Sequence, residues 1–142
     1  MALRLLITSS RKPGLTPEQF KEHYENHAEL IKRLAGDTFP LSHRRIYIAR
    51  TTTNTNTLST GTDDATPRNA TTPATVLRGT QTQFDFDATA ELTFESQAAF
   101  DCFVARLQEP ENAAQIEADE EGFLERSSVG IVFVGDVTET VR

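Results

Sequence analysis

The side chains best able to move a proton near neutral pH are gathered in one stretch of this chain, residues 11–50. The 142-residue sequence contains three histidines and two tyrosines, and all five lie in that stretch: His23, Tyr24, His27, His43 and Tyr47. Imidazole changes its charge between pH 5 and 8, and a phenol in a dry pocket is a fixed hydrogen-bond donor. The clustering favours acid/base chemistry on a small molecule.

Each of these side chains also has a structural interpretation. A histidine on an apolar helical stripe is often a core residue, and Tyr24 and Tyr47 can fill space with their hydroxyls at the rim. Asp87 can orient an imidazole or act as a base, or it can lie on a solvated strand face. Arg45 can bind a carboxylate or a polarised carbonyl, or form an ion pair at a subunit contact. The sequence leaves these alternatives open.

A helix beginning after Thr16 must position the first histidines. Thr16 has the side chain of an N-cap, Pro17 suits the first helical position, and Gln19 is placed to close a capping box. Gly36 ends the helix. Spacings of four, three, four and three residues predict one core-facing stripe, which contains Phe20, Tyr24, His27, Ile31 and Leu34.

Strands are predicted at residues 3–8, 42–50, 84–94 and 129–134, the first of them buried on both faces. On the second strand the two-residue period places His43, Arg45 and Tyr47 on one face. On the third it places Phe84 and Phe86 with the apolar residues, opposite Asp85 and Asp87. Further helices are predicted at residues 96–107 and 110–121, and the acidic run 109–126 is interpreted as a solvated helical face.

The order of elements predicts an α+β fold of the ferredoxin-like, split β-α-β type, with helices on one face of an antiparallel sheet. The uncovered face predicts a homodimer. One domain spans residues 1–142, with a Thr-rich flexible insertion or ragged hairpin at about 51–82 that serves as a lid or as decoration.

Composition narrows the function classes. A net charge of −7 argues against nucleic acid, and no apolar run approaches the roughly 20 residues that span a bilayer. With a single cysteine, no secretory signal and no phosphate loop or metal-ligand spacing, we expect a cytoplasmic protein without a metal or other cofactor. Cys102 is expected to be structural.

Four segments together resemble the EthD family of dimeric α/β-barrel proteins, in particular its fungal branch associated with polyketide tailoring. They are R-K-P-G-L-T-P-E-Q-F-K-E-H-Y-E-N-H, L-A-G-D-T-F-P-L-S-H-R-R-I-Y-I-A-R, F-D-F-D-A-T-A-E-L-T-F-E-S-Q-A-A-F and A-D-E-E-G-F-L-E. The resemblance implies a ferredoxin-like protomer, a homodimer closed sheet to sheet, and a pocket between sheet and helices. It matches the family's helical histidine to His27 and the P-L-S-H-R-R segment to His43. We rank His43 first because the family's spacing is kept around it.

We therefore predict a cofactor-independent enzyme, a lyase or cyclase, that acts on a phenolic or β-dicarbonyl polyketide by dehydration, decarboxylation or cyclisation. The catalytic residues are expected to be His43, His27, Tyr47 and Asp87. The substrate-binding residues are expected to be Tyr24, Arg45, Phe20, Phe39 and Phe86. The alternatives are a cofactor-free anthrone-type monooxygenase and a non-catalytic dimer that binds a hydrophobic metabolite.

Overall fold

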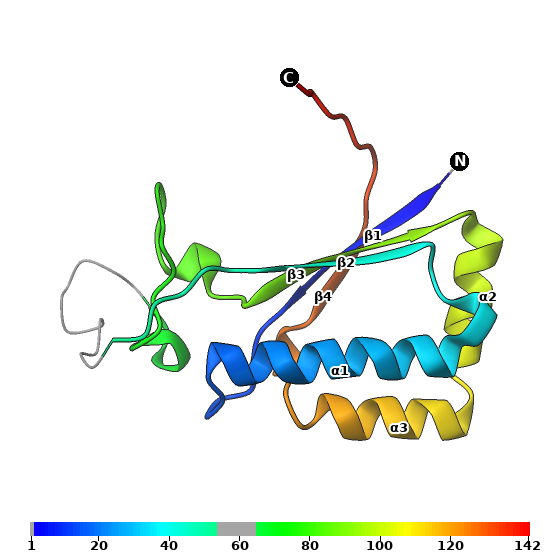
Figure 1. The fold of residues 1–142 in the computed structure, drawn as a ribbon, viewed down its shortest axis with the longest axis horizontal. Helices are drawn as coiled ribbons and strands as arrows, with labels where there is room; N and C mark the ends of the chain where they lie inside the picture. Colours follow the sequence, from blue (N-terminus) through cyan, green and yellow to red (C-terminus); the bar gives the residue numbers. More distant parts are fainter. Residues whose placement is uncertain (1, 54–64) are drawn as a thin grey trace.

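The computed structural model describes residues 2–53 and 65–142 and contains one four-stranded sheet (Figure 1). The strand order is β2-β3-β1-β4, and every neighbouring pair is antiparallel. The sheet is open, with β2 and β4 at its edges. The strands are β1 (Leu3–Ser9), β2 (Ser42–Tyr47), β3 (Ala88–Phe94) and β4 (Gly130–Phe133).

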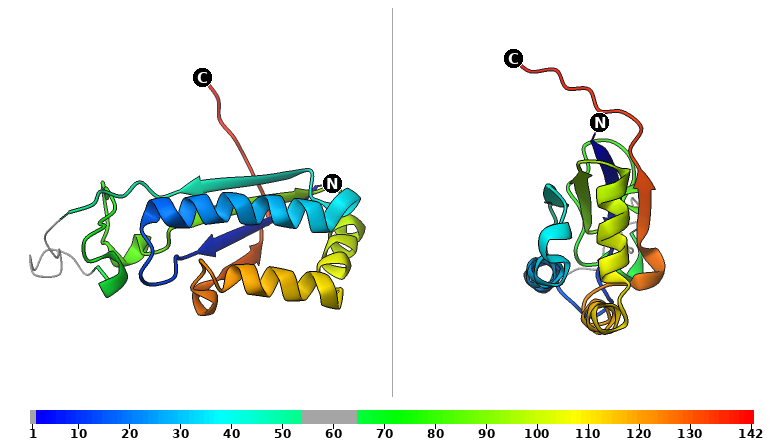
Figure 2. Two further views of the ribbon diagram at one scale, coloured as in Figure 1. Left: turned by 60° about the horizontal axis from the view of Figure 1, so that its bottom comes forward. Right: turned by 90° about the vertical axis from the view of Figure 1, so that its right-hand side faces the viewer.

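All three helices lie on the same side of this sheet (Figures 1 and 2). They are α1 (Pro17–Ala35), α2 (Gln97–Leu107) and α3 (Pro110–Glu120). The order strand, helix, strand, strand, helices, strand, with β3 between β1 and β2, is the split β-α-β arrangement. The predicted ferredoxin-like α+β fold is confirmed.

Helix α1 begins where its local chemistry requires. The Thr16 hydroxyl accepts a hydrogen bond from the Gln19 amide at 3.1 Å, and the Gln19 side chain accepts one from the Thr16 amide at 2.9 Å. Two backbone N–H groups that the helix leaves free are thereby satisfied. Gly36 follows the helix with φ of +57°, a conformation that favours glycine.

The two faces of the sheet have different surroundings. Leu5, Leu92 and Phe94 point to the helices and are buried in the core, whereas Leu6 is 36% exposed on the opposite face. Ile46 and Val132 are also exposed on that open face. The expectation that β1 is buried on both faces is therefore wrong for the single chain, because helices cover only one of them.

Three predicted strands are shorter in the structure, of which β4 (Gly130–Phe133, predicted at 129–134) loses only one residue at each end. β2 ends at Tyr47 rather than at residue 50, and β3 begins at Ala88 rather than at residue 84. The residues beyond these ends turn out of the sheet into a buried cluster, in which Asp87 contacts both Arg11 and Arg50. Asp87 and Arg50 therefore lie just outside the regular strands.

The described part of the insertion forms an irregular hairpin. Backbone hydrogen bonds join Thr51 to Pro73, Thr53 to Thr71, and Thr75 to Ala49. The buried side chain of Asn69 fixes this segment to Arg11 and Asp85. The ragged-hairpin alternative thus describes residues 49–53 and 71–75, while residues 54–64 of the predicted insertion lie outside the described residues.

Candidate functional site

A cavity of about 220 Å³ lies between the helix-covered face of the sheet and the three helices. Ligand pockets in proteins usually measure about 300–1,000 Å³, so this one suits a small molecule. Its walls are largely apolar and include Ile7, Ile31, Phe39, Leu92, Phe103, Leu107, Ile116, Phe123, Leu124, Val129 and Ile131. The polar side chains on its walls are Ser9, Tyr24, His27, His43 and Glu120.

A short contact between helices α1 and α3 fixes His27 on the wall of this cavity. Nδ1 of His27 lies 2.6 Å from Oδ2 of Asp119, and His27 is 7% exposed. A carboxylate accepts from a protonated Nδ1, so in the neutral ring the proton resides on Nδ1 and Nε2 is the basic nitrogen. The pair therefore has the chemistry of an oriented general base.

The same carboxylate binds a second histidine. Nε2 of His23 lies 2.9 Å from Oδ1 of Asp119, so each carboxylate oxygen faces one imidazole. Burial tends to raise the pKa of Asp119, but the hydrogen bonds from His23 and His27 outweigh it and lower the pKa below its usual value. Asp119 is consequently an ionised acceptor at neutral pH.

His43 faces the cavity from β2 and is held in its neutral form. Burial, with a smaller contribution from the Arg45 charge, lowers the pKa of His43 to about 4. Its Nε2 is buried and has no hydrogen-bond partner among the residues that the structure describes. A buried polar atom without a partner is costly, which makes this nitrogen a candidate contact for a ligand.

Tyr24 lies between the two histidines on the cavity wall. Its ring centroid is 6.5 Å from that of His27 and 6.2 Å from that of His43. Burial raises the pKa of Tyr24 to about 12, so its hydroxyl remains protonated and able to donate a hydrogen bond. A base, a phenol and a neutral imidazole are thus within reach of one small ligand.

One protein family matches most of the chain. Residues 12–127, which include the helices, both histidine-bearing elements and Asp119, match the EthD domain. The chain belongs to the EthD family. No curated protein matches this EthD chain.

Solved structures with the same fold are distant in sequence. The protein At3g17210 from Arabidopsis thaliana is 15% identical, with a TM-score of 0.51 over 98% of this EthD chain and 99% of that one. A dimeric ferredoxin-like protein of unknown function from Thermobifida fusca is 11% identical, with a TM-score of 0.49, over 94% of this chain and 90% of its own. At these identities the likeness to At3g17210 supports the fold and nothing more.

The sequence interpretation missed Asp119 in this EthD domain because the acidic run around it looked like a solvated face. One signal was present: Asp119 follows Ile116 by three residues and precedes Phe123 by four. That spacing puts an acid on the face of the helix that carries Ile116. His23 and His27, four residues apart, form the complementary pair on α1.

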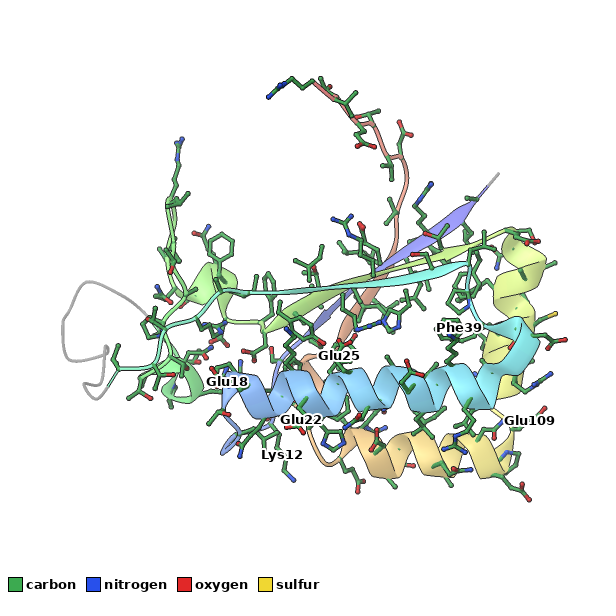
Figure 3. All side chains as sticks on the ribbon, viewed as in Figure 1. Lys12, Glu18, Glu22, Glu25, Phe39 and Glu109 are labelled. Carbon is green, nitrogen blue, oxygen red and sulfur yellow. The ribbon has the colours of Figure 1, made fainter. Side chains whose placement is uncertain are left out.

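Two predicted site residues instead form a cluster with Glu25. The Arg45 guanidinium donates to both Glu25 oxygens at 2.7 and 2.9 Å, and the Tyr47 hydroxyl donates to Glu25 at 2.5 Å. These contacts, the Arg45 hydrogen bond first, lower the pKa of Glu25 to about 2. Neither Arg45 nor Tyr47 lines the cavity with the histidines; Figure 3 shows Glu25 on the side of α1 that faces the sheet.

Asp87 is separated from the histidines as well. Its Oδ1 accepts from Arg11 at 2.6 Å and from Arg50 at 3.0 Å, and its Oδ2 accepts from the Arg11 amide at 2.8 Å. The Asp87 side chain is 3% exposed. Asp87 does not reach the cavity that the histidines line, and instead lines a second cavity together with Phe20 and Tyr47.

The three predicted phenylalanines are dispersed. Phe39, labelled in Figure 3, lines the cavity beside His43, with ring centroids 6.4 Å apart. Phe20 is 1% exposed in the core against Tyr24 and lines a separate cavity of about 180 Å³. Phe86 stands near Phe84, away from both.

Within residues 2–53 and 65–142, no group of three or more histidine, cysteine or acidic side chains is arranged to hold a metal ion. In the same residues, no helix has the length and apolar character needed to cross a bilayer.

Proposed function

We propose that this protein is an enzyme in which neutral His27, oriented by Asp119, removes or relays an acidic proton of a small, mostly apolar molecule bound in the cavity. The observation that carries the proposal is the 2.6 Å contact between His27 and Asp119 at the wall of an apolar pocket. The chemistry uses only side chains of the chain itself, so it requires no cofactor.

In the proposed first step Nε2 of His27 takes a proton from carbon or oxygen of the ligand. The C–H or O–H bond breaks, and its electron pair remains on the ligand as an enolate or phenolate. The Tyr24 hydroxyl donates to the oxygen on which that charge develops. The imidazolium formed on His27 is stabilised by ionised Asp119.

In the second step the imidazolium of His27 returns the proton. Delivered to a departing hydroxyl group it completes loss of water, and delivered to another carbon of the enolate it completes an isomerisation. In a ring closure the enolate carbon attacks a carbonyl carbon of the same ligand, and the alkoxide oxygen formed there takes the proton. For loss of carbon dioxide the proton removed first is that of a carboxyl group; the C–C bond to this group then breaks, its electron pair forms an enolate, and the proton goes to the enolate carbon. His43 supplies a neutral imidazole at the opposite wall, where it can donate to or accept from a ligand oxygen. Compounds with acidic protons and apolar rings, such as phenolic and β-dicarbonyl polyketides, suit these walls.

The test is turnover by the wild type and by His27→Ala and Asp119→Asn, on a panel of one- to three-ring phenols and cyclic β-dicarbonyl compounds. Mass spectrometry would detect loss of water or carbon dioxide, and C–H exchange in heavy water would detect proton abstraction alone. We expect each substitution to lower turnover about 10²- to 10⁴-fold. Asp101→Asn, on the exposed side of α2, is the matched control.

Full turnover by a folded His27→Ala protein and also by His43→Ala would show that the histidines do not carry the reaction. Two other outcomes would support different functions. Oxygen consumption with an anthrone, without added flavin or metal, would support a monooxygenase. A ligand that copurifies and is unchanged after incubation would support a binding protein, an alternative that the apolar walls of the cavity favour.

We also propose that the open face of the sheet packs against a second copy of the chain. Exposed Leu6, Ile46 and Val132 lie on that face, next to the Arg44–Glu91 ion pair. Covering these apolar side chains gives the hydrophobic contribution that the helices do not supply on this side.

A further inference from the structure

His23 lies beside the catalytic pair without lining the cavity. Its side chain is 32% exposed, and its Nε2 donates to Oδ1 of Asp119 at 2.9 Å. The proton transfer proposed for His27 does not use it. An exposed histidine that binds a surface carboxylate could simply be a solvated contact between α1 and α3, so the surroundings of its ring decide what it does.

The ring of His23 occupies a fitted slot at the end of α3. It stacks on Phe123, with ring centroids 4.5 Å apart and planes inclined by 25°. Phe123 is fully buried and lines the cavity. On another side lies Gly122, where an added Cβ would be only 2.7 Å from Cε1 of His23. Phe123, Gly122 and the Asp119 carboxylate thus border the imidazole on three sides.

This position controls the orientation of Asp119. A carboxylate bound only by His27 can rotate about its side-chain torsions and offer either oxygen. With Oδ1 held by His23, Oδ2 is the oxygen that remains for Nδ1 of His27. The histidines stand four residues apart on α1, so one helix face determines both contacts.

We propose that His23 is a positioning residue: it holds the Asp119 carboxylate in the orientation that keeps the His27 proton on Nδ1 and leaves Nε2 basic. The proposal rests on the proposed function of His27 for its catalytic consequence. The geometric part, the tautomer of His27, can be measured whether or not a substrate is known.

The test compares His23→Leu with His23→Gln. The glutamine amide retains a donor for Asp119, whereas leucine retains only bulk. In ¹⁵N-labelled protein above pH 7, the imidazole ¹⁵N shifts of His27 report which nitrogen carries the proton. We expect wild type and His23→Gln to show the Nδ1–H form, and His23→Leu to show a mixture in which the Nε2–H fraction rises several-fold. Turnover, where present, should fall about tenfold in His23→Leu alone, the factor that corresponds to one hydrogen bond.

A second variant displaces the ring without removing it. Gly122→Ala should push His23 away from Asp119 and shift the His27 tautomer in the same direction as His23→Leu. In the double variant, Gly122→Ala should add much less, because the ring it displaces is absent and only the 3.2 Å approach of the added Cβ to the backbone oxygen of Asp119 remains. Gly135→Ala is the control, since no heavy atom lies within 4 Å of its added Cβ.

The outcomes separate the two proposals. Unchanged His27 shifts in a folded His23→Leu protein would overturn the positioning role and leave the function of His27 intact. Shifts that change as expected, in a protein without turnover on any substrate, would support the positioning role and count against the enzyme. A tautomer change in Gly122→Ala that persists undiminished in the His23→Leu background would show that Gly122 acts by another route. It would contradict the proposal that the space beside Gly122 holds the His23 ring against Asp119.

Discussion

At the scale of single residues, His43 should make the protein sensitive to mild acid. Its pKa falls to about 4 in the folded chain because burial opposes the charged form, while an unfolded histidine titrates near 6.5. The unfolded state therefore binds a proton between pH 6.5 and 4 that the folded state does not. Stability is lost as the pH falls through this range.

Replacing His43 with phenylalanine should remove most of this pH dependence. The wild type should lose roughly 2 kcal/mol of unfolding free energy between pH 7 and pH 4, after discounting for partial exposure, and His43→Phe should lose clearly less. Urea unfolding at pH 7, 5.5 and 4 measures both curves. The pKa values of Glu25 and Asp119 lie below their usual ranges. Protonation of these two carboxylates therefore lowers the unfolding free energy mainly below pH 4.5. Parallel curves for the two proteins would exclude the burial of a neutral His43 as the cause.

Tyr24 and Tyr47 illustrate how similar residues take different roles. Burial raises the pKa of both, with Glu25 adding to the effect at Tyr47. Only Tyr24 lines the cavity with the histidines, because it lies on α1 one turn before His27. Tyr47 lies on the same face of β2 as His43 but four residues further along the strand. There its hydroxyl donates a hydrogen bond to Glu25. Strand period fixes the face of a side chain, and distance along the strand decides which site it reaches.

At the scale of elements, local chemistry made the helices predictable. The capping box at Thr16 and the Ser96 side chain that accepts from the Ala99 amide specify where α1 and α2 begin. The apolar stripe of α1 and the period of β2 likewise indicated that His27 and His43 face the same side of the sheet. Each of these signals acts within a few residues, so the sequence contains it in full.

Contacts between distant elements were not predictable in the same way. Asp119 reaches His27 across 92 residues of sequence, and Asp87 reaches Arg11 across 76. Neither acid has a local pattern that selects its partner. The strand predicted to start at residue 84 has the expected alternation, yet in the structure it begins only at Ala88, directly after the buried Asp87 that pairs with Arg11 and Arg50.

The buried cluster around Asp87 should be among the most sensitive positions for stability. Asp87→Asn leaves the Arg11 and Arg50 guanidiniums, each 2% exposed, without their shared counter-charge. Leaving such charges unpaired costs about 3–5 kcal/mol. Urea unfolding should show this loss, while Glu117→Gln, which breaks an exposed pair with Arg126, should change stability by less than about 0.5 kcal/mol.

The same variant tests the role of Asp87. A structural residue should leave turnover per folded molecule unchanged at a temperature where Asp87→Asn is still folded. A large loss of turnover with little loss of stability would instead support the catalytic role that the sequence suggested.

At the scale of the whole molecule, the open sheet face is the basis of the proposed homodimer. Figure 2 shows the helices on one side of the sheet, so within residues 2–53 and 65–142 no helix covers the other side. That side mixes exposed Leu6, Ile46 and Val132 with charged Arg4 and Arg44. Exposed apolar side chains on such a face are unfavourable in water. The face suits a two-fold symmetric dimer, in which the same residues of both subunits form the interface.

We expect light scattering coupled to gel filtration to give a mass near twice the 15.8 kDa of one chain. Ile46→Asp, or Leu6→Asp, should give the single-chain mass, because the two-fold axis places two new carboxylates in an apolar contact and desolvates both. Ala105→Asp, on the exposed side of α2, should remain a dimer. Since the cavity lies on the helix-covered side, a folded monomer should still retain the His27–Asp119 pair and its tautomer. A wild-type protein that is monomeric at high concentration would show that the open face is stable in water.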